Sequence, residues 1–364
     1  MSETTIVAVG DIFLGGGVTE LATVKGKNYY LDAIAPAIQA SNIAIGNLES
    51  PVCQKPNVKA EYLAPPPSLL DGLKSAGFTA VSLANNHTLD FGKAGLEQTI
   101  TALKERNIGY AGASLDSSTA QQPLTISGNP NLVLLSYYGK KMGTSDRQGY
   151  TNGAQLEKVL ADIKQVRAEN TVVIVAMHWG GYCRKLPQKY QVDFARQIID
   201  AGAKLVLGSG PHTLQPVELY HDGVIAYSLG NFVFDSQLFD PPRPETRASM
   251  MLRITLSGTE LSKVAVEPVY LNDEHCPESI DCDRHPQLFD DISALLVDRL
   301  DTFESDSQTA LSLFTRHKLR PITTLKKLLF PSQRAHNLSF YFNSLMQLIK
   351  EKLSTLNTSR SHTR

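Results

Sequence analysis

The amino-acid sequence predicts an α/β protein in which helices cover both faces of a sheet. Short apolar runs alternate with helical stretches from residue 4 to about residue 230, and most of these runs are apolar at nearly every position. Continuous apolar runs are typical of strands buried on both faces, and strand–helix alternation is typical of a parallel sheet. Two later runs alternate around a turn, which predicts an added hairpin.

Seven apolar runs are predicted to form the strands of this sheet. They are Thr4–Gly10, Ile43–Leu48, Phe78–Ala84, Asn131–Tyr137, Thr171–Met177, Lys204–Gly208 and Val224–Leu229. The hairpin is expected to pair Ser249–Leu256 with Leu261–Tyr270, because both runs alternate and flank the turn sequence Ser-Gly-Thr-Glu.

Helices are predicted where apolar side chains recur on one helical face. Leu96, Ile100 and Leu103 share a face of the stretch 93–107. The stretch 153–166 has the same periodicity. Both stretches lie between predicted strands, so we expect them to cover the sheet.

The character of the chain changes after residue 271. We expect one domain over residues 1–271, a polar linker over 272–287 and a helical, basic extension over 288–364. Helices are predicted within that extension at Leu288–Phe303 and at 338–356.

Charge is distributed unevenly along the chain. From Leu311 onward there are ten Lys or Arg and one Glu, a net +9, which leaves −10 on the rest of a chain of net charge −1. An apolar helical stripe with lysines beside it, at 338–356, predicts docking on the acidic body or, alternatively, contact with an anionic membrane surface. No basic motif interleaved with aromatic residues occurs, so nucleic acid is not an expected partner.

The composition is that of an ordinary globular protein, with 364 residues, 42% of them hydrophobic and 20% charged. The four cysteines are too few and too scattered for a disulfide framework, which favours a reducing compartment. The N-terminal sequence lacks the pattern of a signal peptide, and the apolar runs fall far short of the roughly 20 residues that span a bilayer. We therefore expect a cytoplasmic protein, peripheral to the membrane if the basic helices bind lipid.

Polar side chains follow the carboxyl ends of nearly all the predicted strands. Ligands of open α/β sheets bind beyond these ends, so the positions define a candidate site. The residues are Asp11, Asn47, Glu49, Asn85, Asn86, His87, His178, Ser209, His212, Asn231 and Asp235.

Carboxylate, amide and imidazole groups together indicate a metal site. They suit Zn²⁺, Mn²⁺ or Fe, and a two-metal site can generate a hydroxide and stabilise an in-line displacement at phosphorus. Each residue alone also has a structural explanation. Asp11 could cap a turn, His87 could be a hydrogen-bonded structural histidine, and Asn85 and Asn86 could be turn residues. Six strand ends carry such polar groups, and this recurrence favours one metal site over separate structural explanations.

Several of these positions lie in motifs that resemble a known family. The motifs are VAVGDIFLGGGV (7–18), IGNLESPV (45–52), SLANNHTLDFGKAGLEQT (82–99), AMHWGG (176–181), IIDAGAKLVLGSGPHTLQPVELY (198–220) and IAYSLGNFVFD (225–235). In order and content they resemble the CapA family of poly-γ-glutamate capsule synthesis proteins, within the calcineurin-like metallophosphoesterase superfamily. The resemblance spans roughly residues 5 to 270.

This resemblance implies a sandwich of two mixed β-sheets flanked by helices, with a site for one or two divalent ions of Mn, Fe or Zn. The implied metal ligands are Asp11, Glu49, Asn86, His178 and His212. His87 would be the general acid or a charge stabiliser, which requires a proton-carrying group near neutral pH. Asn85 is assigned with His87 to the catalytic set.

Two positions depart from the family's pattern. Ser209 stands where a ligating histidine is expected, and Tyr182 stands where a glutamate often follows the His-Trp-Gly motif. Serine is a poorer ligand than imidazole for these metals. The departures keep open a second hypothesis, a degenerate domain that binds polyglutamate or a partner protein without turnover.

The leading hypothesis is a metal-dependent hydrolase of the CapA type, linked by resemblance to capsule poly-γ-glutamate. Its expected partner is an anionic polymer or a phosphoester substrate, cleaved at a phosphoester or at the amide of a γ-glutamyl chain. Replacement of His87 would separate the two hypotheses, because an enzyme would lose turnover whereas a binding module would be nearly indifferent.

Overall fold

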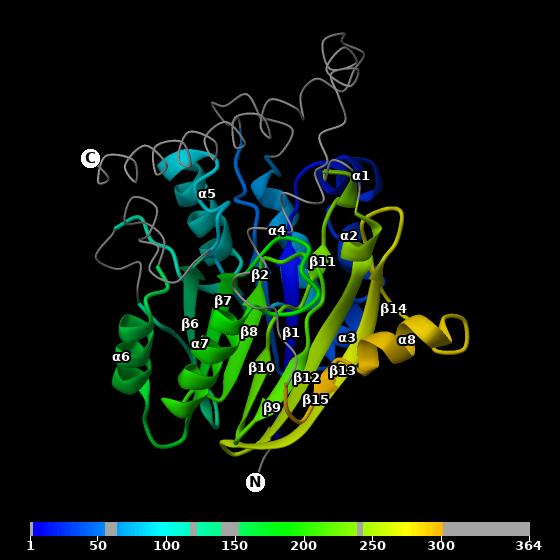
Figure 1. Cartoon of the computed structure of the whole chain (residues 1–364). Coiled ribbons are helices and arrows are strands. Elements are labelled where there is room, and N and C mark those ends of the chain that lie inside the picture. The colour runs from blue at the N-terminus through cyan, green and yellow to red at the C-terminus, as the bar shows by residue number, and fades with distance from the viewer. Residues whose placement is uncertain (1–2, 55–63, 117–121, 140–152, 239–242, 301–364) are drawn as a thin grey trace, which may run out of the picture. The chain divides into compact units, whose positions relative to one another are not determined.

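Two mixed sheets face each other in the computed structural model of the chain, which describes residues 3–54, 64–116, 122–139, 153–238 and 243–300 (Figure 1). Within these residues the first sheet has eight strands: β1 (Glu3–Ile12), β2 (Ile43–Leu48), β3 (Ala80–Ser82), β4 (Gly109–Ala111), β11 (Asn231–Val233), β12 (Ala248–Ser257), β13 (Glu260–Leu271) and β14 (Pro277–Ser279). The second has seven: β5 (Leu124–Ile126), β6 (Asn131–Gly139), β7 (Thr171–Trp179), β8 (Leu205–Ser209), β9 (Val217–Tyr220), β10 (Gly223–Ala226) and β15 (Leu296–Val297).

Each sheet has a parallel centre and antiparallel additions. In the first sheet the order is β14-β13-β12-β1-β2-β3-β4, with β1 to β4 parallel, β12 to β14 antiparallel, and β11 parallel to β1. In the second the order is β15-β9-β10-β8-β7-β6-β5, and β6, β7, β8 and β10 are parallel. The carboxyl ends of the parallel strands therefore share one edge in each sheet.

Helices cover the outer face of each sheet. Against the first sheet pack α1 (Gly17–Lys25), α2 (Tyr29–Asp32), α3 (Ala35–Gln39), α4 (Leu70–Ala76) and α5 (Gly92–Glu105), with the 3₁₀ turn η2 (Pro67–Leu69) before α4. Against the second pack α6 (Leu156–Val166) and α7 (Lys189–Asp200). Figure 1 shows α6 and α7 on one side of the sandwich and α1 and α2 on the other.

The strands are buried on both faces because their side chains alternate between two cores. Ile6 and Ala8 of β1 lie in the core between the sheets, whereas Val7 and Val9 pack against the helices. This arrangement explains the continuous apolar runs from which the strands were predicted.

The predicted hairpin is confirmed, since β12 and β13 pair from Ala248 with Tyr270 to Ser257 with Glu260. The seven predicted strands also correspond to observed ones, although Phe78–Ala84 shortens to β3 and Val224–Leu229 to β10. The sequence did not reveal the short strands β4, β5, β9, β11, β14 and β15.

The chain beyond residue 271 differs from the expectation. The segment expected as a linker, 272–287, contains β14, which pairs with β13. The predicted helix Leu288–Phe303 ends early: α8 covers Pro286–Ser293, and Leu296 and Val297 then pair with β9 as β15. The segment forms a strand instead of a longer helix, because it pairs with the open edge of the second sheet.

The remainder of the basic extension, including the predicted helix at 338–356, lies outside the described residues. Within the part of the chain that the structure describes, no helix is both long and apolar enough to cross a membrane. The short 3₁₀ turns η3 (Ser236–Leu238) and η4 (Pro244–Arg247) complete the described elements.

Gly10, near the end of β1, is predicted to be a position where the fold tolerates no side chain. A Cβ at this position would lie 1.9 Å from the carbonyl oxygen of Gly230, the same oxygen that accepts a 2.9 Å hydrogen bond from the Asp11 amide. Gly10→Ala should therefore lower the free energy of unfolding by about 3 kcal/mol or more, measured by urea unfolding. Gly128→Ala is the control, since its nearest neighbour would be 3.1 Å away in an exposed loop, and it should cost less than about 1 kcal/mol. Equal stabilities would contradict this packing.

Candidate metal centre

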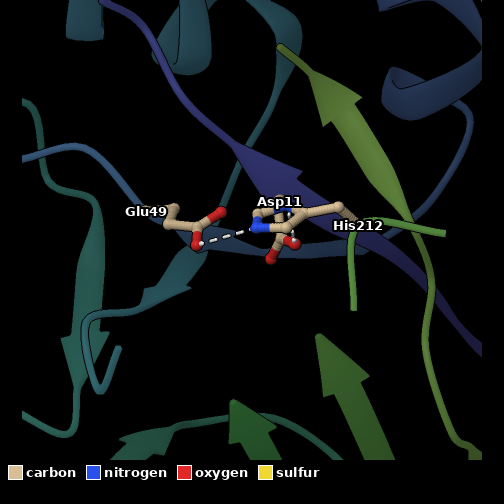
Figure 2. Close-up of side chains that lie close together, drawn as sticks. All are labelled: Asp11, Glu49 and His212. Carbon is tan, nitrogen blue, oxygen red and sulfur yellow. Dashed lines mark ion pairs between the residues drawn. The ribbon is translucent and has the colours of Figure 1, made fainter. Parts of the chain in front are cut away.

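Side chains from both sheets meet where the parallel strands end. Asp11 lies near the end of β1, and Glu49 follows β2 directly. From the second sheet, His178 lies near the end of β7 and His212 lies three residues past β8. The pairing of β1 with its neighbours is irregular at Asp11, and such irregularities redirect a side chain relative to a regular strand. Figure 2 shows Glu49 and Asp11 both next to the imidazole of His212.

The carboxylate of Glu49 is the centre of this cluster. Its Oε1 atom lies 3.6 Å from His178 Nε2, 3.8 Å from His212 Nε2 and 3.9 Å from His87 Nε2. The residue is 1% exposed, and neither carboxylate oxygen has a hydrogen-bond partner among the described residues. A buried carboxylate without donors is costly unless a positive charge compensates it.

Asp11 is held in place by hydrogen bonds. Asn47 Nδ2 donates to its Oδ1 at 2.8 Å, and the Gly210 amide donates to its Oδ2 at 3.2 Å. His212 Nδ1 lies 3.4 Å from the same Oδ2 and 2.9 Å from Asn231 Oδ1. Asp11 is fully buried, so these contacts fix its carboxylate in one position.

The pKa values of the cluster show how strongly it attracts positive charge. Burial, with the charge of Asp11, raises the pKa of Glu49 to about 7. Burial alone would lower the pKa of His212, but Glu49 and Asp11 outweigh it and raise that pKa to about 9. Burial would raise the pKa of Asp11, but His212, His178 and Asn47 lower it. The two buried carboxylates therefore favour positive charge at this cluster.

The donors fit a divalent metal ion. One ligand atom each from Asp11, Glu49 and His212 lie within 4.8 Å of one another. Ligand atoms at about 2.0–2.2 Å from one ion lie up to about 4.4 Å apart, so a small movement would close the set. A cation would also compensate the Glu49 oxygens that lack donors. Carboxylate oxygen and imidazole nitrogen suit Zn²⁺, Mn²⁺ or Fe.

His178 is oriented by its neighbours. Its Nδ1 atom lies 3.1 Å from Ser209 Oγ and 3.2 Å from Asn47 Nδ2, which leaves Nε2 facing Glu49. Ser209, the residue that departs from the family's pattern, thus contacts the side of His178 away from the carboxylate. Hydrogen bonds on the outer nitrogen of a histidine set its ring orientation and its tautomer.

His87 is paired with Asp90. Its Nδ1 atom lies 2.7 Å from Asp90 Oδ2, and its Nε2 atom faces Glu49. Burial would lower the pKa of His87, but the charge and hydrogen bond of Asp90, together with Glu49, raise it. Phe13 packs edge-to-face on its ring at 5.6 Å between centroids. His87 can therefore present a proton to the cluster from Nε2.

Asn85, predicted as catalytic, makes contacts that support the loop. Its Nδ2 donates to Asn47 Oδ1 at 3.2 Å and to the Leu48 carbonyl at 2.9 Å, and its Oδ1 accepts from the His87 amide at 3.1 Å. These contacts hold the loop in place, and the catalytic role of Asn85 stays a prediction. Asn86, partly buried in the same loop, stays a predicted metal ligand.

Three residues of the site were not among the predicted metal ligands and catalytic residues. Asn47 bridges Asp11 and His178, Asn231 contacts His212, and Asp90 contacts His87. The position of Asn47 and Asn231 at strand ends was the feature of the sequence that pointed to their role. Asp90 follows His87 by three residues, and no pattern in the sequence distinguished it from a turn residue.

Proteins of similar sequence include capsule biosynthesis proteins. A family model described as bacterial capsule synthesis protein PGA_cap matches residues 5–236. The capsule biosynthesis protein CapA of Bacillus anthracis is 33% identical over 249 residues, which cover 64% of this chain and 60% of that protein. The PGA biosynthesis protein CapA of Bacillus subtilis is 29% identical over 274 residues, which cover 73% of this chain and 71% of that protein.

Among solved structures, the fold is similar to that of a phosphatase from Mycoplasma pneumoniae. The TM-score is 0.50 at 11% sequence identity, and the match covers 78% of this chain and 99% of that one. At this identity the likeness concerns the fold alone. It confirms the predicted fold, a metallophosphatase-like sandwich of two mixed sheets flanked by helices.

Glu49→Gln is expected to remove most of the stabilisation by metal, because it keeps the shape of the side chain but removes its charge. Addition of Mn²⁺ or Zn²⁺ to the chelator-treated chain, at a hundredfold excess over Kd, should raise the free energy of unfolding by about 2.7 kcal/mol. This stabilisation is measured as a rise in Tm. Glu49→Gln should lose most of that rise.

Glu218→Gln is the matched control. Glu218 is also fully buried, but it pairs with Arg196 at 2.6 Å and accepts a hydrogen bond from Tyr227 instead of facing the cluster. This variant should unfold at a lower temperature and keep the rise with metal. An equal rise in Glu49→Gln and the unsubstituted chain would contradict the assignment.

Proposed function

Because the chain belongs to the bacterial capsule synthesis protein family PGA_cap, we propose that it is a metal-dependent hydrolase of an anionic substrate. The proposed scissile bonds are a phosphoester or the amide of a γ-glutamyl polymer. The observation that supports this most strongly is Glu49, a buried carboxylate with three imidazoles within 3.9 Å and no hydrogen-bond donor in the described part of the chain. Such a group is costly in a protein that binds no cation there.

Asp11, Glu49 and His212 would hold the ion, with His178 beside them and Asn86 as a further proposed ligand. A divalent ion supplies Lewis acidity and lowers the pKa of bound water. Asn47 and Gly210 keep Asp11 in position, and Asn47 and Ser209 keep His178 in position. The chain thus supplies a preorganised set of donors, which is the main contribution of a protein to such chemistry.

His87 would donate a proton to the leaving group from Nε2. Asp90 holds the opposite nitrogen at 2.7 Å and raises the pKa of the imidazole, which favours the protonated form near neutral pH. Phe13 packs against His87 and against Phe234, whose ring contacts His212 at 5.2 Å. These two aromatic side chains, both at least 94% buried, limit the access of water to the two imidazoles from that side.

The second candidate function is a binding module without turnover, for polyglutamate or for a partner protein. Ser209 favours it, because a ligating histidine is expected at this position in the family. The serine hydroxyl lies 3.1 Å from His178 Nδ1 and is a poorer metal ligand than imidazole. The basic extension beyond the described residues keeps its two predicted roles, docking on the acidic body or contact with an anionic membrane surface.

Replacement of His87 separates the two functions. With Mn²⁺ or Zn²⁺ bound, the chain is expected to hydrolyse p-nitrophenyl phosphate, bis-p-nitrophenyl phosphate or γ-linked polyglutamate. His87→Ala should lower kcat by roughly 10²- to 10⁴-fold, while metal content and Tm are retained.

Asp90→Asn provides a second readout. Without the Asp90 charge the pKa of His87 falls, so the limb on which activity is lost with rising pH should move to lower pH. A metal-loaded chain that turns over none of the three substrates, but binds polyglutamate equally well with and without His87, would support the binding module.

A further inference from the structure

Two loops at the cluster are held in strained conformations. The loop after β7 contains Gly180 and Cys183 with φ of 84° and 52°, and the loop after β8 contains Gly210 and His212 with φ of 105° and 61°. A left-handed conformation is costly for Cys and His, which have a Cβ atom. Non-glycine residues in this region cluster at sites where geometry serves function.

Hydrogen bonds join the two loops. The Cys183 amide donates to the Pro211 carbonyl at 2.8 Å, and Thr213 Oγ1 donates to the Arg184 carbonyl at 2.8 Å. Gln215 Nε2 donates to the same Arg184 carbonyl at 3.0 Å and to the Leu186 carbonyl at 3.1 Å. The loop that follows His178 is therefore fixed to the loop that carries His212.

These loops hold an exposed aromatic ring next to the cluster. Tyr182 lies between Gly180 and Cys183, is 50% exposed, and packs edge-to-face with His212 at 5.6 Å between centroids and 72° between planes. His212 in turn lies 3.8 Å from Glu49. Among the described residues, the only other large hydrophobic side chain that is exposed is Val24, on α1.

We propose that Tyr182 is a specificity-determining residue that receives a planar group of the substrate. This planar group would lie next to the substrate's anionic group, such as its phosphoryl group. The inference rests on the proposed function, because it assumes that the metal cluster binds that anionic group. A ring fixed by its loops loses little entropy when it binds, and its exposed surface offers stacking area to an aryl or other planar group.

The test compares two anions that differ only in their planar group. Binding of phenylphosphonate and methylphosphonate to the Mn²⁺-loaded full chain is measured by calorimetry. The phenyl compound should bind roughly three- to tenfold more tightly, the range expected for one aromatic contact. Tyr182→Phe keeps the ring and should keep this preference. Tyr182→Leu keeps an apolar side chain without the ring and should lose it, with unchanged metal content.

Val24→Ala is the control for loss of an exposed apolar side chain, and it should leave the preference intact. Equal binding of the two phosphonates, or a preference that survives in Tyr182→Leu, overturns the inference and leaves the proposed hydrolase standing. If neither phosphonate binds the metal-loaded chain, the proposed anion site fails, and the inference fails with it.

Discussion

The burial of the Glu49 carboxylate among imidazoles is the constraint on which the rest of the site depends. Neither of its oxygens receives a hydrogen bond from any residue that the structure describes, although Glu49 is 1% exposed. The histidines around it or a bound cation can compensate its charge. The raised pKa values of Glu49 and His212 are the electrostatic consequence of this arrangement. The supporting contacts of Asn47, Ser209 and Asn231 keep the neighbouring donors pointing at the same place.

The sandwich makes this arrangement achievable. Asp11 comes from the central strand β1 of the first sheet, and His178 comes from β7 in the second. Both carboxylates come from the first sheet, and His178 and His212 come from the second, so the cluster forms where the strand ends of the two sheets approach each other. The absence of a side chain at Gly10 lets β1 approach Gly230, which leads into β11, and so brings Asn231 to His212. The close packing at Gly10 thus determines where the donor residues lie.

Much of this organisation could be predicted from the sequence because parallel strands leave their ends on one edge. That rule places Asp11 and Glu49 at one edge of the first sheet, and His178 and His212 at one edge of the second. The two edges meet because the sheets pack as a sandwich. The rule fails for Asp90, whose role depends on the local path of the loop after β3. It also fails beyond residue 271, where apolar periodicity predicted a helix to Phe303 but pairing with β9 takes over at Leu296. Periodicity reports a local preference, whereas an open sheet edge is a property of the folded chain.

The most direct test of the central claim is the metal content of the purified chain, prepared without chelators and measured by elemental mass spectrometry. If a cation compensates the charge of Glu49, the chain should contain one to two equivalents of Mn, Fe or Zn. The Asp11→Ala variant should lose this metal. A content near zero that persists after incubation with these metals would contradict the claim. Glu49 would then be balanced by protonated histidines or be neutral itself, because burial raises its pKa to about 7.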